Sequence, residues 1–179
     1  RALSAQQTIP YEEMYQDGIC HIQNQLYSKS VCCEDINYKE ASDDEKAVLF
    51  ELYCKLVNYF GPSVDFELSV ICYPADMEEY RRLLAIKAKG DQHDVIRKEY
   101  SDMLVRQVSK SRYERRICLT YTIEADTIKQ ARSRLSQIEG DVINRFRALN
   151  VETKPMDGYE RLAVFHKCLH LEEPRKFRF

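Results

Sequence analysis

The sequence predicts an α+β fold: a mixed, mostly antiparallel sheet of about five strands, with helices mainly on one face. The chain has 179 residues and 44% apolar composition, enough to build one hydrophobic core. Its predicted elements follow the order β-β-α-β-α-α-β-α-β-α. This order contains two β-α-β units separated by a pair of helices, which favours a ferredoxin-like split β-α-β arrangement with a helical insertion.

The first elements are a hairpin, a helix and a strand. Residues 18–36 alternate apolar and polar side chains around a turn at Asn24 and Gln25, which predicts a β-hairpin. Ser42 and Glu45 form a capping-box pattern, so a helix begins there and ends near Phe60. Its apolar residues at helical spacing are Phe50, Tyr53, Val57 and Phe60. Residues 65–73 alternate again and are rich in strand formers.

The middle of the chain predicts the helical insertion. Asp76 and Glu79 repeat the capping pattern for a helix through about Lys89, and Gly90 interrupts it. Asp94 can cap a second helix to about Ser109. The side chains expected on the core-facing side of that helix are Ile96, Tyr100, Met103, Leu104 and Val108.

The last third predicts a second β-α-β unit and a final helix. Residues 115–125 form a strand whose inward side chains are Ile117, Leu119, Tyr121 and Ile123. Asp126 caps a regular helix to Leu149, and residues 150–155 can form a short strand. Asp157 then begins a helix that ends near His170.

Domain organisation follows from these elements. We expect an N-terminal extension at residues 1–17, a single α+β domain at 18–170, and the start of a linker at 171–179. The chain opens on Arg1 and closes on RKFRF, which suggests a piece of a longer protein. Seven cysteines, an odd number, without an apolar signal region favour a reducing compartment. The longest apolar run is far shorter than the roughly 18 residues of a spanning helix.

Catalytic signatures are lacking in the sequence. A phosphate-binding loop needs a glycine pair five residues apart followed by Lys-Ser or Lys-Thr, and none of the five glycines meets this pattern. We therefore predict that this fragment is not an enzyme, and that it carries no cofactor and no catalytic residue.

A metal or redox role for the cysteines and histidines is a second alternative function. The predicted turn places Cys20 opposite Lys29 and on the same face as Cys33, with Cys32 on the other face. Adjacent cysteines on opposite faces cannot converge on one ion, and two histidines at 166 and 170 are too few for a site. We therefore expect no metal site and interpret the cysteines as buried strand residues.

A basic block at residues 81–116 is the remaining candidate site, with 11 basic and 5 acidic side chains. It could contact an acidic partner, an anionic lipid surface or nucleic acid, so a nucleic-acid-binding module is the first alternative function. The candidate surface residues are Arg81, Arg82, Arg97, Lys98, Arg106, Lys110, Arg112, Arg115 and Arg116.

Several strings identify a family resemblance. They are DINYKEA, the helix ending NYF, IRKEYSDMLVRQ, TIEADTIKQARSRLSQIE, MDGYERLAVFH and the closing FRF. Together they cover nearly the whole chain. They resemble the amino-terminal part of the large conjugation ATPase of type IV secretion systems, in the version found on integrative and conjugative elements of Gram-positive bacteria.

The resemblance implies a non-catalytic docking and assembly domain. The full-length protein is then expected to be an ATPase, with ATP and Mg²⁺ bound by a motor domain absent from this chain. The implied partners are inner-membrane channel proteins, with self-association through the full-length motor and no direct DNA binding expected. The implied location is cytoplasmic and peripheral, at the inner face of the cell membrane.

Overall fold

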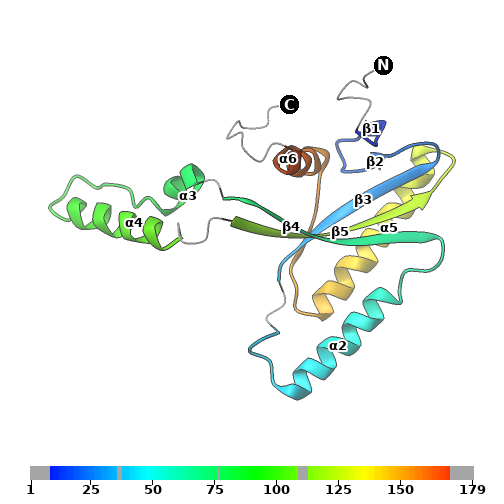
Figure 1. Ribbon diagram of the computed structural model, residues 1–179, viewed down its shortest axis with the longest axis horizontal. Helices are drawn as coiled ribbons and strands as arrows, with labels where there is room; N and C mark the ends of the chain where they lie inside the picture. The colour runs from blue at the N-terminus through cyan, green and yellow to red at the C-terminus, as the bar shows by residue number, and fades with distance from the viewer. Residues whose placement is uncertain (1–8, 36–37, 76, 109–112, 170–179) are drawn as a thin grey trace.

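A computed structural model describes residues 9–35, 38–75, 77–108 and 113–169, and it confirms the α+β fold (Figure 1). The strands are β1 Glu13–Met14, β2 Cys20–His21, β3 Leu26–Cys33, β4 Val64–Pro74, β5 Tyr113–Glu124 and β6 Thr153–Pro155. The helices are α2 Asp43–Val57, α3 Met77–Leu84, α4 Asp94–Val108, α5 Ile128–Ala148 and α6 Gly158–Leu169. Of these described helices, none combines the length and apolar character needed to cross a bilayer.

The sheet has the ferredoxin-like strand order. β3 and β5 pair in the centre, β4 pairs with the outer side of β5, and β6 pairs with the other side of β3. β2 also pairs with β3, and β1 extends from β2 at the margin. Every pair between described strands is antiparallel, as expected for a split β-α-β unit whose crossovers are the helices α2 and α5.

The helices lie in two layers. α2 and α5 lie on one side of the sheet and α6 lies on the other (Figure 1). The larger core is on the α5 side, where Leu135, Val142 and Phe146 pack against Val31 and Leu119 of the sheet. The smaller core, on the α6 side, consists of Cys118, Met156 and Val164. The predicted inward face of β5 is confirmed, because Leu119, Tyr121 and Ile123 belong to the larger core and Ile117 packs against it.

The register of the first hairpin differs from the prediction. Asn24 adopts a left-handed φ of 55°, and the N–H of Ile22 bonds the carbonyl of Leu26 at 3.0 Å around it. The turn is therefore one residue longer, and Cys20 lies opposite Ser28 rather than Lys29. Because side chains alternate between faces, this one-residue shift places Cys20 on the face of Cys32, not of Cys33.

The helix caps follow side-chain chemistry closely. The predicted capping box of α2 is present, with the N–H of Glu45 bonding Ser42 Oγ and the N–H of Ser42 bonding the Glu45 carboxylate. α5 is capped by Thr127 rather than by Asp126, because the Thr127 hydroxyl accepts the N–H of Gln130 at 3.3 Å. Asp157 caps α6 as predicted, accepting the N–H of Glu160 at 2.8 Å.

The apolar residues noted at helical spacing in α2 are not the ones that this helix packs against the core. Leu49, Leu52 and Leu56 pack against the core, whereas Phe50 is 66% exposed and Tyr53 is 44% exposed. The helix carries two adjacent apolar stripes at helical spacing, and only one of them can face the sheet. The second stripe remains on the surface.

The predicted insertion forms a helical arm, which we define as residues 77–108. It projects from the end of β4 and β5, away from the sheet (Figure 1). α3 ends at Leu84 rather than near Lys89, because the next amides bond side chains of α4: the N–H of Ile86 bonds Ser101 Oγ at 3.0 Å, and that of Lys89 bonds Asp94 at 2.9 Å. The side of α4 that was expected to face the core is largely exposed at Ile96, Tyr100 and Met103, because the arm projects away from the sheet.

Of the two acidic residues predicted to cap the helices of the arm, the one that the structure describes is not a cap. Asp94 is the first residue of α4 rather than its cap, and its carboxylate accepts backbone N–H groups of the preceding loop. Asp76, the predicted cap of α3, lies outside the described residues.

Two glycines let the start and the end of the described chain approach each other. A Cβ atom on Gly18, which has a φ of +82°, would lie 1.9 Å from the carbonyl oxygen of Met156. A Cβ atom on Gly158 would lie 2.3 Å from the carbonyl oxygen of Tyr15. Real Cβ atoms do not come this close to backbone, so both positions require glycine.

We therefore expect Gly158→Ala to lower the free energy of unfolding by about 3 kcal/mol, since the added methyl group would force two backbone segments apart. The matched control is Gly140→Ala in α5, where a Cβ atom meets nothing within 4 Å. The control should instead stabilise the protein by up to about 1 kcal/mol. Urea unfolding followed by circular dichroism measures both, and equal effects of the two substitutions would contradict the close approach.

Candidate functional site

The cysteines and histidines do not form a metal site among the described residues, where no group of three or more potential ligands occurs. Cys32 and Cys118 lie opposite each other on β3 and β5. Burial raises the pKa of the Cys33 thiol to about 12 and that of the Cys118 thiol to about 11. These two thiols are protonated at neutral pH and are poor ligands and nucleophiles. His166 lies on α6, and His170 lies outside the described residues.

Buried charge on the α5 side is paired within the core. Lys29 on β3 lies 2.8 Å from the Glu139 carboxylate on α5, although only 7% of Lys29 is exposed. Tyr59 donates a hydrogen bond of 2.7 Å to Asp141, and the guanidinium of Arg145 lies over the Tyr59 ring. Burial raises the pKa of Tyr59 to about 12. We interpret this group as a structural link between the sheet, α2 and α5.

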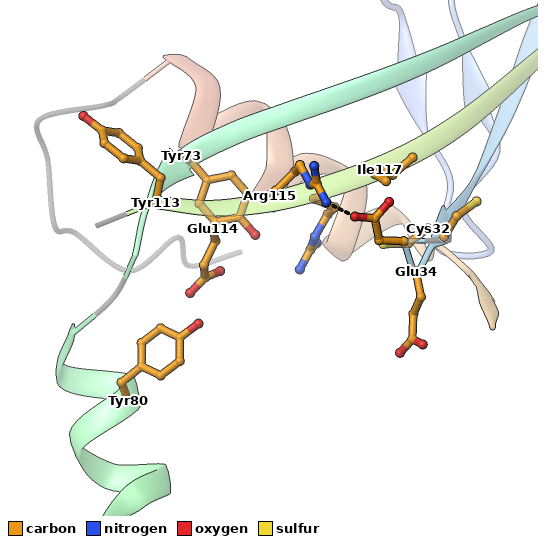
Figure 2. A pocket seen from close by; sticks show the side chains of 11 residues that line it. Cys32, Glu34, Tyr73, Tyr80, Tyr113, Glu114, Arg115 and Ile117 are labelled. Atoms are coloured by element: carbon orange, nitrogen blue, oxygen red, sulfur yellow. Dashed lines mark hydrogen bonds and ion pairs between the residues drawn. The ribbon is translucent and has the colours of Figure 1, made fainter. Parts of the chain in front are cut away.

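A shallow cavity of about 670 Å³ lies where the arm joins the sheet (Figure 2). Tyr73, Tyr80 and Tyr113 line one side of it, and Glu34 and Arg115 line the other. Arg115 forms an ion pair with Asp35 (Figure 2). The mixed charges and the wide opening of this cavity provide no matched set of ligands for a small molecule.

The predicted basic block is spread over three elements rather than gathered in one patch. Arg81 and Arg82 lie on α3, Arg97, Lys98 and Arg106 lie on α4, Arg115 and Arg116 lie on β5, and Lys110 and Arg112 lie outside the described residues. Several members pair with carboxylates close by. Arg81 pairs with Glu78, and Arg115 pairs with Asp35.

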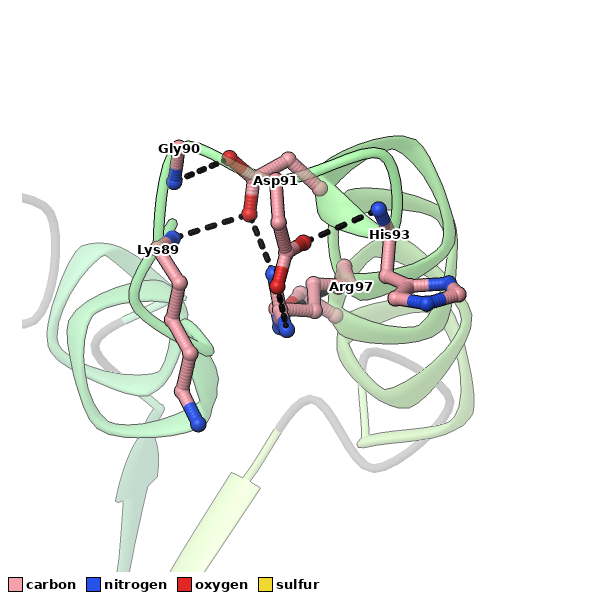
Figure 3. A network of polar contacts seen from close by, with 7 residues as sticks. Lys89, Gly90, Asp91, His93 and Arg97 are labelled. Carbon is pink, nitrogen blue, oxygen red and sulfur yellow. Dashed lines mark hydrogen bonds and ion pairs between the residues drawn. The ribbon is translucent and has the colours of Figure 1, made fainter.

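Arg97 organises the loop between α3 and α4 (Figure 3). Its guanidinium contacts both Asp91, at 2.6 Å, and Asp94. These carboxylates in turn accept the backbone N–H groups of His93, at 2.9 Å, and of Gly90, at 2.8 Å. Arg97 is therefore a structural residue of the arm, not a free cation for a ligand.

The arm as a whole is nearly neutral. Residues 77–108 contain seven basic and six acidic side chains, because α3 brings Glu78 and Glu79 into the same unit. A strong positive field is the main source of non-specific affinity for nucleic acid. The charge distribution therefore does not favour the nucleic-acid-binding alternative.

An exposed apolar surface spans α2 and β4, and we call it the α2–β4 surface: Phe50, Tyr53, Phe66, Leu68 and Val70. The β4 members are 40%, 48% and 58% exposed, respectively. Phe60 joins the two elements, because its ring stacks on Phe66 with centroids 4.4 Å apart. Phe60 follows the end of α2 at Val57, so this stacked pair lies where the chain passes from α2 towards β4.

The outer edge of β4 adds unpaired backbone to this surface. β4 is 11 residues long and pairs only with β5 among the described strands. A long edge strand presents a row of free N–H and C=O groups that can pair with another chain. Its alternating apolar side chains lie beside that row, which is the arrangement that strand-adding partners use.

In comparisons with known proteins, no protein family matches the chain, and no curated protein matches it.

We expect Arg97→Ala to loosen the loop between α3 and α4, since it removes the cation that holds both Asp91 and Asp94. Amide hydrogen exchange at Gly90 and His93 should then accelerate by roughly tenfold or more, while exchange in β5 should stay unchanged. Exchange unchanged at both amides would contradict the role given to Arg97.

Lowering the pH should act on the same loop. Arg97 lowers the pKa of Asp91, and the N–H of Lys89 with Arg97 lowers that of Asp94. At pH values above 3.8, the ordinary pKa of an aspartate, both carboxylates stabilise the folded loop. This contribution is lost as the pH falls through their lowered pKa values. Exchange protection of the two amides should therefore hold at pH 5 and fall toward pH 2 to about the level of the variant.

We also expect no appreciable DNA binding, with a Kd weaker than about 10 µM at roughly 0.15 M salt. Fluorescence anisotropy with a labelled duplex, titrated at several salt concentrations, measures this. Submicromolar affinity that falls steeply with salt would instead favour the nucleic-acid alternative.

Proposed function

We propose that the chain is a non-catalytic docking and assembly domain of a conjugative-transfer ATPase of a type IV secretion system. It attaches the motor to inner-membrane channel proteins at the cytoplasmic face of the cell membrane. The nucleotide chemistry then belongs to a motor domain outside this chain. The family strings along the chain support this proposal, as does the lack of a phosphate-binding loop in its sequence.

The α2–β4 surface is the observation that carries the proposal. A patch of large, exposed apolar side chains on a protein surface marks an interaction site. Here they accompany the long outer edge of β4. A partner could therefore add a strand to β4 and cover Phe66, Leu68 and Val70 with its own alternating side chains.

The charges near this edge favour a basic partner strand. Asp65 and Glu67 of β4 are exposed, on the side of the strand opposite the apolar residues. A partner strand with apolar residues on one side and lysine or arginine on the other would match both faces.

We expect Leu68→Lys to weaken binding to the channel proteins of the same secretion system by at least about tenfold, because a lysine on the apolar face cannot be covered without desolvation. The substitution lies on an exposed edge, so the free energy of unfolding should change by no more than about 0.5 kcal/mol. Co-purification of the full-length motor with these proteins measures the interaction, and mating assays measure transfer.

The matched control is Val48→Lys, which changes an exposed residue on a different side of α2. It should leave both co-purification and transfer frequency unchanged. Wild-type levels of both for Leu68→Lys would remove the α2–β4 surface as the docking site.

A further inference from the structure

A second cavity of about 610 Å³, the α6 groove, lies between α6 and the sheet face opposite α5. Its floor carries hydroxyl groups from β3 and β5: Ser28, Ser30, Thr120 and Thr122. Its walls are mainly apolar and include Tyr11, Ile71, Met156, Val164, Phe165 and Leu169. Volume and lining both match sites that bind a small molecule with one polar end.

Arg161 of α6 lines this groove and is only 6% exposed. One terminal nitrogen of its guanidinium donates to the carbonyl of Gly18 at 2.8 Å and to that of Ser28 at 3.0 Å. The other donates to Ser28 Oγ at 3.0 Å. These bonds occupy three of its five N–H donors, and the group remains charged at neutral pH.

The charge of Arg161 has no counter-ion in the part of the chain that the structure describes. Its partners are carbonyl and hydroxyl oxygens, and each described ion pair with a carboxylate involves another cation. Burial lowers the pKa of Arg161, which reflects the cost of a desolvated cation. Lys29, the other buried cation among the described residues, contrasts with Arg161 because Glu139 neutralises it. An anion in the α6 groove would offset this cost.

We propose that the α6 groove binds an anionic amphiphile, with its carboxylate or phosphate head at Arg161 and its apolar tail along α6. The Ser28 and Ser30 hydroxyls lie beside the head position, and Met156, Val164 and Phe165 lie along the tail. This inference rests on the α6 side of the sheet and does not depend on the proposed docking function.

The orientation of the amphiphile follows from the second charge that lines the groove. Glu67 of β4 lies opposite Thr120, which lies opposite Ser30 of β3. Glu67 is therefore two strand spacings, or about 10 Å, from Ser30, which lies beside the proposed head position. The groove is positive at its β3 end and negative at its β4 end, so an anionic head belongs at the β3 end.

Isothermal titration calorimetry of the full chain with decanoate tests the proposal, with decyltrimethylammonium as the cationic probe of equal chain length. Decanoate should bind at least about tenfold more tightly, the scale of one charge-assisted hydrogen bond. Co-sedimentation with phosphatidylglycerol vesicles then distinguishes the source of the anion. Binding to decanoate alone indicates a free acid, and binding to both indicates a lipid headgroup.

Thr122→Phe tests the location, because Thr122 lies opposite Ser28 at the proposed head position, and a phenyl ring there fills that end of the groove while keeping a strand-forming residue. It should weaken decanoate binding by at least about tenfold. The matched control is Val70→Phe, an exposed site on the opposite face of the neighbouring strand, which should bind as the wild type does. Arg161→Met, if circular dichroism shows it folded, should remove the preference for decanoate over the cation.

Three results would overturn the proposal: no decanoate binding up to about 1 mM, the weakest affinity a specific site would show; equal affinity for decanoate and the cationic probe; or undiminished binding by Thr122→Phe. None of them bears on the α2–β4 surface, so failure here is separate from failure of the docking function.

Discussion

The alternation of side chains along β3 is the constraint on which both cores depend. β3 pairs with β2, β5 and β6, so no other described strand has as many neighbours. Tyr27, Val31 and Cys33 face α5, while Ser28 and Ser30 face α6. A slip of one residue would exchange these two sets and bury hydroxyls in the apolar core. The register with β5 is fixed by this cost.

The two sides of the sheet are consequently unequal. The α5 side holds the large apolar core and accounts for most of the hydrophobic stabilisation, whereas the cluster on the α6 side comprises only three buried residues. α6 stays in place there through specific contacts, namely the close approach at Gly158 and the bonds from Arg161 to the first hairpin. A side that is stabilised by a few directed contacts can keep an open groove, whereas a closely packed side cannot.

Much of the fold could be predicted from local patterns. The strands β4 and β5, the helix α5 and the capping box at Ser42 follow from alternation, helical spacing and side-chain chemistry. The error in the first hairpin arose where two local solutions were nearly equivalent. Asn24 can adopt a left-handed conformation that lengthens the turn by one residue. The choice between such solutions depends on tertiary contacts that no short window contains.

The candidate sites were harder to predict than the fold. The basic block was defined by a window that begins at Arg81 and so leaves out Glu78 and Asp35, which neutralise two of its members in space. The role of Arg161 could not be predicted from the sequence, because a single arginine in an amphipathic helix is ordinary. Only its burial next to Ser28 makes it unusual. Its position three residues after Gly158, in the first turns of a helix capped by Asp157, was the available signal.

The arm leaves the sheet and returns to it at one point, since Pro74 of β4 pairs with Tyr113 of β5. An insertion anchored in this way can change in length or sequence without shifting any strand, because the cost of a longer loop between fixed ends grows slowly. The arm can therefore diverge between related proteins while the sheet is retained.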